Sequence, residues 1–289
     1  MTDAELIEAF GAFQRGRAFS ENTVRRRRLS LGRFAKHMAP ASITTATVLD
    51  VDGWCDKLKS ARTKHAYTSD LATFFTWACR RGLAPSNPMT NFERVRVPKA
   101  LPKPAPLAAI ADAFGRADAD VQLMLMLGAL AGLRRAEIAS LDMCNVHLDA
   151  VPPVLVVREG KGGKDRIVPL HPTLQRMLRG RRSGFLFPAR TPRGHAHPDA
   201  IGVALAKALS TPERHLTAHS LRHYFGTEAA RNSHGNLLLV GALLGHASPA
   251  TTQGYVAFAA DGMAEVVAAI TGVAERGDEL AARRSRRAV

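Results

Sequence analysis

The sequence is short of cysteine and of long apolar runs. Its three cysteines, Cys55, Cys79 and Cys144, are widely spaced and form no CxxC pair. This spacing argues against a disulfide framework or a zinc site and favours a reducing compartment. No run reaches the roughly 18 consecutive apolar residues of a membrane span, and the N-terminus lacks the pattern of a signal peptide. We therefore expect a soluble, cytoplasmic protein with no membrane partner.

Acidic residues are also scarce, because 25 Asp and Glu stand against 40 Lys and Arg. The formal net charge is +15 and the pI is about 10.6. Such an excess favours a polyanionic partner, with nucleic acid ahead of an acidic membrane. Arginine-rich surfaces also occur in high-GC proteomes, so charge alone is weak support. The 46% hydrophobic content and the length of 289 residues fit two domains with packed cores.

Residues 1–97 have the pattern of a helical domain. Apolar side chains recur at helical spacing in 20–38, 47–58 and 63–81. Ser20 and Thr47 are predicted N-caps, and Gly82 is a predicted stop. Tyr67 falls on an aromatic stripe that is typical of core packing, which makes it a poor candidate for catalysis.

Basic residues of this domain and of the following segment are candidate DNA contacts. A run of four arginines can be a solvated helix face or a set of phosphate ligands, and the sequence favours neither. Residues 98–106 alternate proline with other residues and are predicted to be an extended linker. The candidate DNA contacts are Arg25, Arg26, Arg27, Arg28, Lys64, Lys99 and Lys103.

The second domain, 107–289, opens with an almost continuous apolar stretch at 121–133. If the helix continued, Leu130, Arg134, Glu137 and Leu141 would share one face. A buried arginine is costly unless it is paired or functional. Two interpretations stay open: a structural pair between Arg134 and Glu137, or a phosphate clamp in which Glu137 orients Arg134.

Two β-like runs, 154–158 and 166–170, flank a glycine-rich segment that carries Lys161 and Lys164. They predict a hairpin with a basic tip. The P-loop pattern GxxxxGK[ST] before a helix is missing, so ATP binding is not expected. Residues 261–273 are predicted to form a C-terminal helix with one apolar side. A basic tail follows Gly277.

The stretch from His219 to Tyr255 joins several candidate catalytic residues. His219 and Arg222 stand three apart and share a helix face. An apolar helix at 236–244 is predicted to end at Gly245, with His246 directly after it and Tyr255 nine residues later. These residues would form a cationic cluster with one phenol, suited to holding a phosphodiester while a tyrosine attacks it.

The ordered motifs GLRxxE, GKGxK, HxLRH and LLGH, followed by Tyr255, resemble the tyrosine recombinase (phage integrase) family. The resemblance covers essentially all of the second domain. It implies an all-α, SAM-like core-binding domain and a mainly α catalytic domain with a small antiparallel sheet. The catalytic residues it implies are Arg134, Lys161, His219, Arg222, His246 and the nucleophile Tyr255, with Glu137 orienting Arg134.

The resemblance also implies an activity. The enzyme would cleave and rejoin strands of double-stranded DNA recombination sites through a 3′-phosphotyrosyl intermediate, with neither metal nor any other cofactor. Four protomers, monomeric when free, would assemble on DNA, with the apolar side of the helix at 261–273 docked on a neighbouring protomer. In this scheme His219 accepts the phenol proton, the two arginines hold the non-bridging oxygens, and Lys161 protonates the 5′ oxygen.

Alternatives to this function remain open. A type IB topoisomerase could use the same residues, and a catalytically silent DNA-binding protein could retain the fold. Among recombinases, the length suits an Xer-like dimer resolvase, since little room exists for an extra N-terminal arm-binding domain. The segments after Arg222 and Tyr255 look more like compact phage integrases, and we expect an integrase of a phage or another mobile element.

Overall fold

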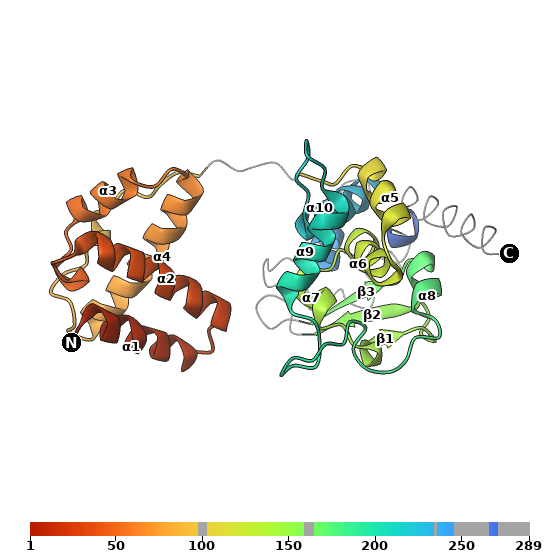
Figure 1. Cartoon of the computed structure of the whole chain (residues 1–289), viewed down its shortest axis with the longest axis horizontal. Coiled ribbons are helices and arrows are strands. Elements are labelled where there is room, and N and C mark those ends of the chain that lie inside the picture. Colours follow the sequence, from red (N-terminus) through yellow and green to blue (C-terminus); the bar gives the residue numbers. More distant parts are fainter. Residues whose placement is uncertain (98–102, 159–164, 234–235, 246–265, 271–289) are drawn as a thin grey trace. The chain divides into compact units, whose positions relative to one another are not determined.

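Figure 1 shows the computed structural model, which describes residues 1–97, 103–158, 165–233, 236–245 and 266–270. The chain divides into two compact units, Met1–Ala100 and Leu101–Val289. The first is helical, and the second is mainly helical with one three-stranded antiparallel sheet, so the expected fold class is confirmed. Within the described residues, no helix is both long and apolar enough to cross a membrane.

Within the described residues 1–97, four α-helices and two short 3-10 helices build the first unit. Phe10, Phe34, Phe74 and Phe75 are fully buried in its core, and the Phe10 and Phe74 rings meet edge to face with centroids 5.5 Å apart. The elements are α1 (Asp3–Arg15), α2 (Glu21–Met38), η1 (Ile43–Thr45), α3 (Val48–Asp56), α4 (Ala61–Arg80) and η2 (Pro88–Thr90).

The predicted helix ends of this unit are confirmed. Ser20 caps α2 by accepting a hydrogen bond from the Thr23 amide, and Thr47 caps α3 in a reciprocal arrangement with Asp50. Gly82 follows α4 at φ +67°, a conformation that favours glycine. Helix α1 was not predicted, although Thr2 and Glu5 form a capping box at its start.

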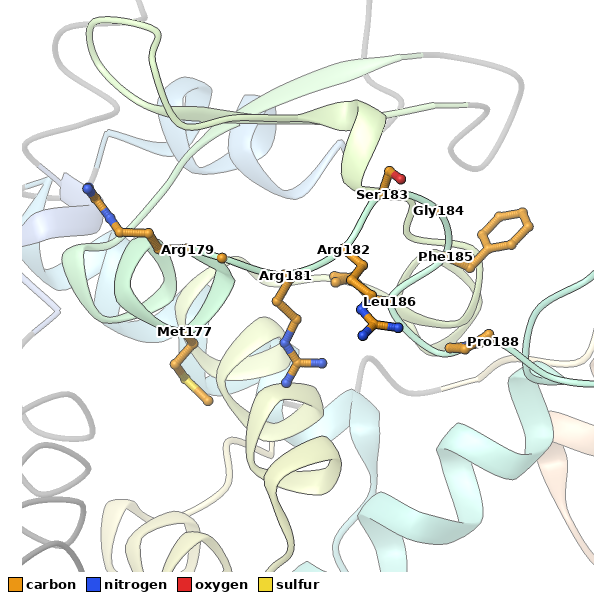
Figure 2. Close-up of a pocket in the computed structure, with 10 residues that line it drawn as sticks. Met177, Arg179, Arg181, Arg182, Ser183, Gly184, Phe185, Leu186 and Pro188 are labelled. Atoms are coloured by element: carbon orange, nitrogen blue, oxygen red, sulfur yellow. The ribbon is translucent and has the colours of Figure 1, made fainter.

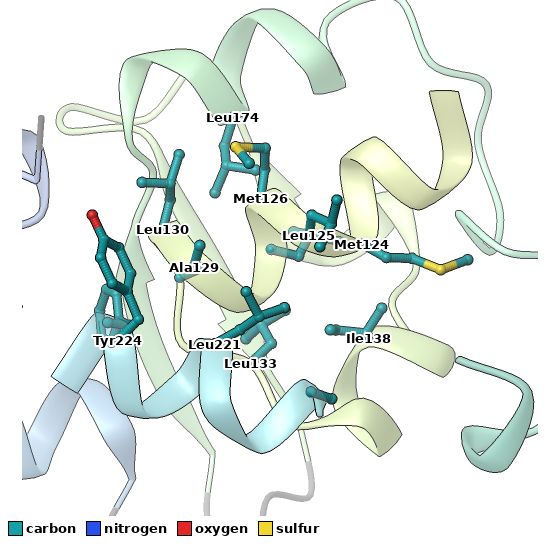
Figure 3. Packing of buried hydrophobic residues seen from close by; sticks show 14 of the residues in the cluster. Met124, Leu125, Met126, Ala129, Leu130, Leu133, Ile138, Leu174, Leu221 and Tyr224 are labelled. Carbon is teal, nitrogen blue, oxygen red and sulfur yellow. The ribbon is translucent and has the colours of Figure 1, made fainter. Parts of the chain in front are cut away.

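The second unit is built around α6, whose residues from Leu123 to Leu130 are all buried. Figure 3 shows these side chains between Leu221 and Tyr224 of α10, Leu174 of α8 and Ile138 of α7. The helices of this unit are α5 (Leu107–Arg116), α6 (Ala119–Leu130), α7 (Arg135–Ala139), η3 (Met143–Asn145), α8 (Pro172–Leu178), α9 (Pro198–Leu209), α10 (Ala218–Asn232) and α11 (Leu237–Leu244).

The expectation that Leu130, Arg134, Glu137 and Leu141 share one helical face is wrong. Helix α6 ends at Leu130, and α7 begins at Arg135 with Arg134 as its N-cap. Gly132 lies between the two helices at φ +62°, which is incompatible with a continuing helix. Because the chain turns here, Arg134 and Glu137 occupy the first turn of a new helix.

Replacing Gly132 by alanine should destabilise the second unit. An added Cβ would lie 2.4 Å from Cδ1 of Phe225, in addition to the strain of a positive φ. We expect a loss of roughly 2–4 kcal/mol in the free energy of unfolding, measured by urea titration. Gly32→Ala is the matched control, because Gly32 lies in α2 with nothing within 4 Å of an added Cβ. Equal stability of the two variants would contradict this account of the turn.

The sheet has the order β1 (Val146–His147), β2 (Val154–Val157) and β3 (Arg166–Pro169). The antiparallel pairing of β2 and β3 confirms the predicted hairpin, while β1 was not foreseen. Leu155 pairs with Val168, and Val157 pairs with Arg166. All four of these side chains are buried, so Arg166 takes an inward position of the strand. Residues 159–164, including Lys161, lie outside the described residues.

The predicted linker and C-terminal helix are only partly described. Ala105 is 1% exposed, and its amide donates to the Ser220 carbonyl at 2.9 Å. This end of the predicted linker therefore packs with the second unit. Val266, Val267 and Ile270 are buried in the hydrophobic cluster of the same unit. The structure thus covers these three side chains within their own chain, contrary to the expectation that a neighbouring protomer covers them.

Candidate active site

Arg134 is the N-cap of α7, and its guanidinium is partly exposed. Its Nη1 donates to Glu137 Oε1 at 2.7 Å, and its backbone amide donates to Glu137 Oε2 at the same distance. Its Nη2 reaches the Gly245 carbonyl at 3.4 Å. These hydrogen bonds hold the side chain in place. It is still 26% exposed, so it remains accessible to a ligand.

Arg222 lies on α10 and is far more deeply buried, at 4% exposure. Its Nη1 donates to the Gly132 carbonyl at 2.5 Å, and its Nη2 donates to the Leu244 carbonyl. Burial, and next the nearby charges of Arg134 and Arg166, lower the pKa of Arg222 to about 10. The group therefore stays protonated at neutral pH.

Arg166 shares the carboxylate of Glu137 with Arg134 and was not identified from the sequence as a site residue. Its Nη1 and Nη2 donate to Glu137 Oε1 and Oε2 at 2.8 and 2.7 Å. Its Nε donates to the Leu243 carbonyl at 3.0 Å. The sequence did hold a signal, because Arg166 and the core residue Val168 share one face of an alternating strand. An inward-facing arginine requires a buried partner.

These arginines converge on the C-terminal end of α11. The carbonyls of Leu243, Leu244 and Gly245 accept hydrogen bonds from Arg166, Arg222 and Arg134 respectively. The last carbonyls of a helix lack helical partners and carry partial negative charge, which cations stabilise. Gly245 closes the helix at φ +59°, as predicted. We call Arg134, Glu137, Arg166 and Arg222 the arginine cluster.

The charge of the arginine cluster suits a phosphate group. Burial raises the pKa of Glu137, but the hydrogen bonds and charge of Arg166, followed by the two hydrogen bonds from Arg134, lower it overall to about 2. The carboxylate is thus ionised, and three guanidinium groups leave a balance of +2. A phosphodiester carries one negative charge and gains a second as a nucleophile adds to it. Preorganised donors of this kind stabilise such developing charge.

Because of Glu137, we expect the free energy of unfolding to decrease at acidic pH. The folded pKa of Glu137, about 2, lies below the usual value near 4.3. Its contribution to the free energy of unfolding is therefore complete above about pH 4.3 and is lost as pH falls towards 2. Glu137→Gln should lower unfolding free energy at pH 7 by roughly 3–5 kcal/mol and weaken the acid dependence. Thermal melts between pH 7 and 2 test this. Glu8→Gln, which removes an exposed partner of Arg28, is the control and should change little.

The histidine motif is only partly described. His219 is exposed on α10, with its ring centroid 4.2 Å from that of His223. Burial, and next the charge of Arg222, lower the pKa of His223. Of the six expected catalytic residues, the structure brings Arg134 and Arg222 together and places His219 one helical turn from Arg222. Lys161, His246 and Tyr255 lie outside the described residues.

The expected DNA contacts of the first unit and of the predicted linker differ in accessibility. The Arg27 side chain is only 14% exposed, and its guanidinium lies 3.5 Å from Asp70 Oδ1 and over the Phe19 ring. Arg26 and Arg28 form ion pairs with Asp70 and Glu8 but stay about half exposed. Arg25 and Lys103 are exposed, Lys64 is intermediate, and Lys99 lies outside the described residues.

A pocket of about 690 Å³ lies along the loop that follows α8. Figure 2 shows Arg179, Arg181 and Arg182 on this loop, with Phe185 at one end. None of the residues that line this pocket belongs to the arginine cluster. The pocket is therefore separate from the candidate active site.

Comparison with solved structures identifies the fold. A crystal structure of lambda integrase bound to DNA matches 88% of this chain and 95% of its own, with a TM-score of 0.66 and 15% identity. The Tn1549 transposon integrase, in complex with a circular intermediate DNA, matches 86% of this chain and 92% of its own, with a TM-score of 0.58 and 19% identity. The chain therefore has the fold of these integrases.

Sequence comparison identifies the family. The phage integrase family model matches residues 105–261. Tyrosine recombinase XerD of Listeria monocytogenes serotype 4b is 30% identical, over 87% of this chain and 93% of its own length. Tyrosine recombinase XerA of Pyrococcus horikoshii is 27% identical, over 88% and 90%. The chain belongs to the phage integrase family and is a tyrosine recombinase, a site-specific recombinase enzyme.

Proposed function

We propose that this enzyme cleaves and rejoins DNA strands through a covalent 3′-phosphotyrosyl intermediate formed by Tyr255. The arginine cluster carries the proposal. Its net charge of +2 at the end of α11 offsets the two negative charges of a phosphodiester under attack. His246 directly follows Gly245, the residue that closes α11. In the cytoplasm, with no metal or nucleotide cofactor, the phosphotyrosyl bond would retain the energy needed for rejoining.

Each expected catalytic residue has a role in this mechanism. Arg134 and Arg222 hold the non-bridging oxygens, and Glu137 orients Arg134 through two hydrogen bonds. The exposed His219 accepts the phenol proton of Tyr255. His246 donates a further hydrogen bond, and Lys161 protonates the leaving 5′ oxygen, which a guanidinium cannot do because it stays protonated.

Duplex DNA and an assembly on it are the proposed partners. The net charge of +15 and the exposed Arg25, Arg26 and Arg28 of α2 support phosphate contacts by the first unit. A lambda integrase tetramer bound to a Holliday junction has the same fold as this chain, with a TM-score of 0.66. It supports a homotetramer on DNA. We propose that the protomers are monomeric when free in solution.

Among recombinases, we propose an integrase of a phage or another mobile element. The residues after Arg222 and Tyr255 favour this function. The alternative is an Xer-like resolvase of chromosome or plasmid dimers, which the likeness to XerD and XerA supports. The two functions differ in their DNA sites, since an integrase joins two different sites and a resolvase acts on two copies of one.

A strand-exchange assay tests the proposed function. The probes are labelled duplexes that span the two junctions between the host chromosome and the mobile element that carries the gene. Unrelated duplexes of equal length serve as controls. We expect joined products from the end-spanning duplexes alone, in EDTA and without ATP. Exchange confined to two copies of one duplex would favour the resolvase. Dependence on added metal or ATP, or no strand exchange on any genomic duplex, would contradict the proposed mechanism.

A further inference from the structure

Arg166 connects three elements that lie far apart in the sequence. From the start of β3 it reaches the carboxylate of Glu137 on α7 and the Leu243 carbonyl at the end of α11. Its side chain is 7% exposed. Because all three of its nitrogens donate to protein groups, it is poorly placed to hold a DNA phosphate itself.

Each carboxylate oxygen of Glu137 serves both Arg134 and Arg166. Oε1 accepts from Arg134 Nη1 at 2.7 Å and from Arg166 Nη1 at 2.8 Å. Oε2 accepts from the Arg134 amide and from Arg166 Nη2, both at 2.7 Å. Because a bidentate arginine fixes the plane of its carboxylate, Arg166 fixes the orientation of the group that in turn holds the Arg134 guanidinium.

Arg166 also packs against Gly245. A Cβ added to Gly245 would lie 2.8 Å from Arg166 Cδ and 3.3 Å from its Nη1. The Gly245 carbonyl accepts from Arg134, and the Leu243 carbonyl accepts from Arg166. The same side chain therefore holds Arg134 through Glu137 and holds the end of α11 directly.

We propose that Arg166 is a positioning residue for strand cleavage, acting through Glu137 and Arg134. This inference rests on the proposed function. Arg166 stays buried and holds Arg134 at the distance and angle required by a non-bridging oxygen. Small displacements of such a donor reduce the reaction rate strongly, because electrostatic stabilisation depends on preorganisation.

Arg166→Lys is the principal test, because it keeps the charge beside Glu137. A single ammonium cannot reproduce the fork that binds both carboxylate oxygens and Leu243. We expect single-turnover cleavage of a nicked suicide duplex to fall about 10-fold to 100-fold, with DNA affinity changed by less than about 3-fold. Arg166→Met should fall further, and thermal melts of both variants report whether they fold.

The matched control is Arg116→Ala. Arg116 also binds a carboxylate with two nitrogens, Asp112 on α5, and also reaches a carbonyl near a helix end, that of Ala208. Unlike Arg166, its side chain is 56% exposed, and it contributes nothing to the arginine cluster. Its loss should leave the cleavage rate unchanged.

A charge-neutral substrate separates positioning from general structural damage. A methylphosphonate at the cleavage site replaces one charged non-bridging oxygen by a methyl group. The cleavage rate should then depend less on Arg134. Arg166→Lys should be impaired less than about 3-fold relative to wild type on this substrate, against 10-fold or more on the phosphodiester. Equal impairment on both substrates, or no impairment on either, would overturn the positioning role. No adduct from the wild type on the phosphodiester would instead contradict the proposed function.

Discussion

Tyr255→Phe should bind DNA like the wild type yet form no covalent adduct with a nicked suicide duplex. The chain has only three tyrosines, Tyr67, Tyr224 and Tyr255, and the structure argues against two of them as nucleophiles. Tyr224 is 7% exposed, and burial raises its pKa to about 12. Such a phenol neither reaches a phosphate nor ionises readily at neutral pH.

Tyr67 is engaged within the first unit. Its ring stacks on Trp54 with centroids 5.4 Å apart, and its hydroxyl accepts a hydrogen bond from Arg33. Tyr67→Phe and Tyr224→Phe are therefore the controls. Each should still form an adduct that survives denaturation and is detected by gel separation. An adduct that persists in Tyr255→Phe would show that another residue attacks the phosphate.

Arg222→Ala should reduce cleavage by roughly 10²–10³-fold, because the proposed mechanism would lose a cation that stabilises the developing phosphate charge. The same change leaves the carbonyls of Gly132 and Leu244 without this donor, so part of the loss would come from lower stability. Arg222→Lys separates the two effects. It retains a cation but cannot donate to both carbonyls and a phosphate in the same planar geometry.

Arg135→Ala is the control for this series. Arg135 neighbours Arg134 in the sequence, but it forms an exposed ion pair with Asp199 at 3.0 Å. We expect Arg222→Lys to cleave at least 10-fold more slowly than Arg135→Ala at equal DNA occupancy, measured in a single-turnover assay. If both variants cleave at the wild-type rate, Arg222 serves only to hold α10 against α11.

Local signals in the sequence predicted much of the architecture. Ser20, Thr47 and Gly245 mark helix ends through capping chemistry that involves only a few neighbouring residues, and all three act as expected. The hairpin of β2 and β3 followed from two β-like runs around a glycine-rich segment. Such features depend little on the rest of the fold, and one sequence is sufficient to predict them.

The errors arose where tertiary contacts decide the structure. Periodicity extended α6 through Arg134, but Gly132 turns the chain, and its missing Cβ leaves room for Phe225. The position of Arg166 in the site depends on β3 meeting α7 and α11, which no local pattern encodes. The contact with a neighbouring protomer expected for Val266, Val267 and Ile270 was likewise wrong, because these side chains pack in their own unit.

The most direct test of the mechanism is to identify the residue that carries the DNA. The wild-type protein is trapped on a nicked suicide duplex, denatured, and digested with protease and nuclease, and the nucleotide-bearing peptide is sequenced by mass spectrometry. We predict a nucleotide joined through its 3′ phosphate to Tyr255. A link to Tyr67, to Tyr224 or to any other side chain, or a link through a 5′ phosphate, would contradict the account.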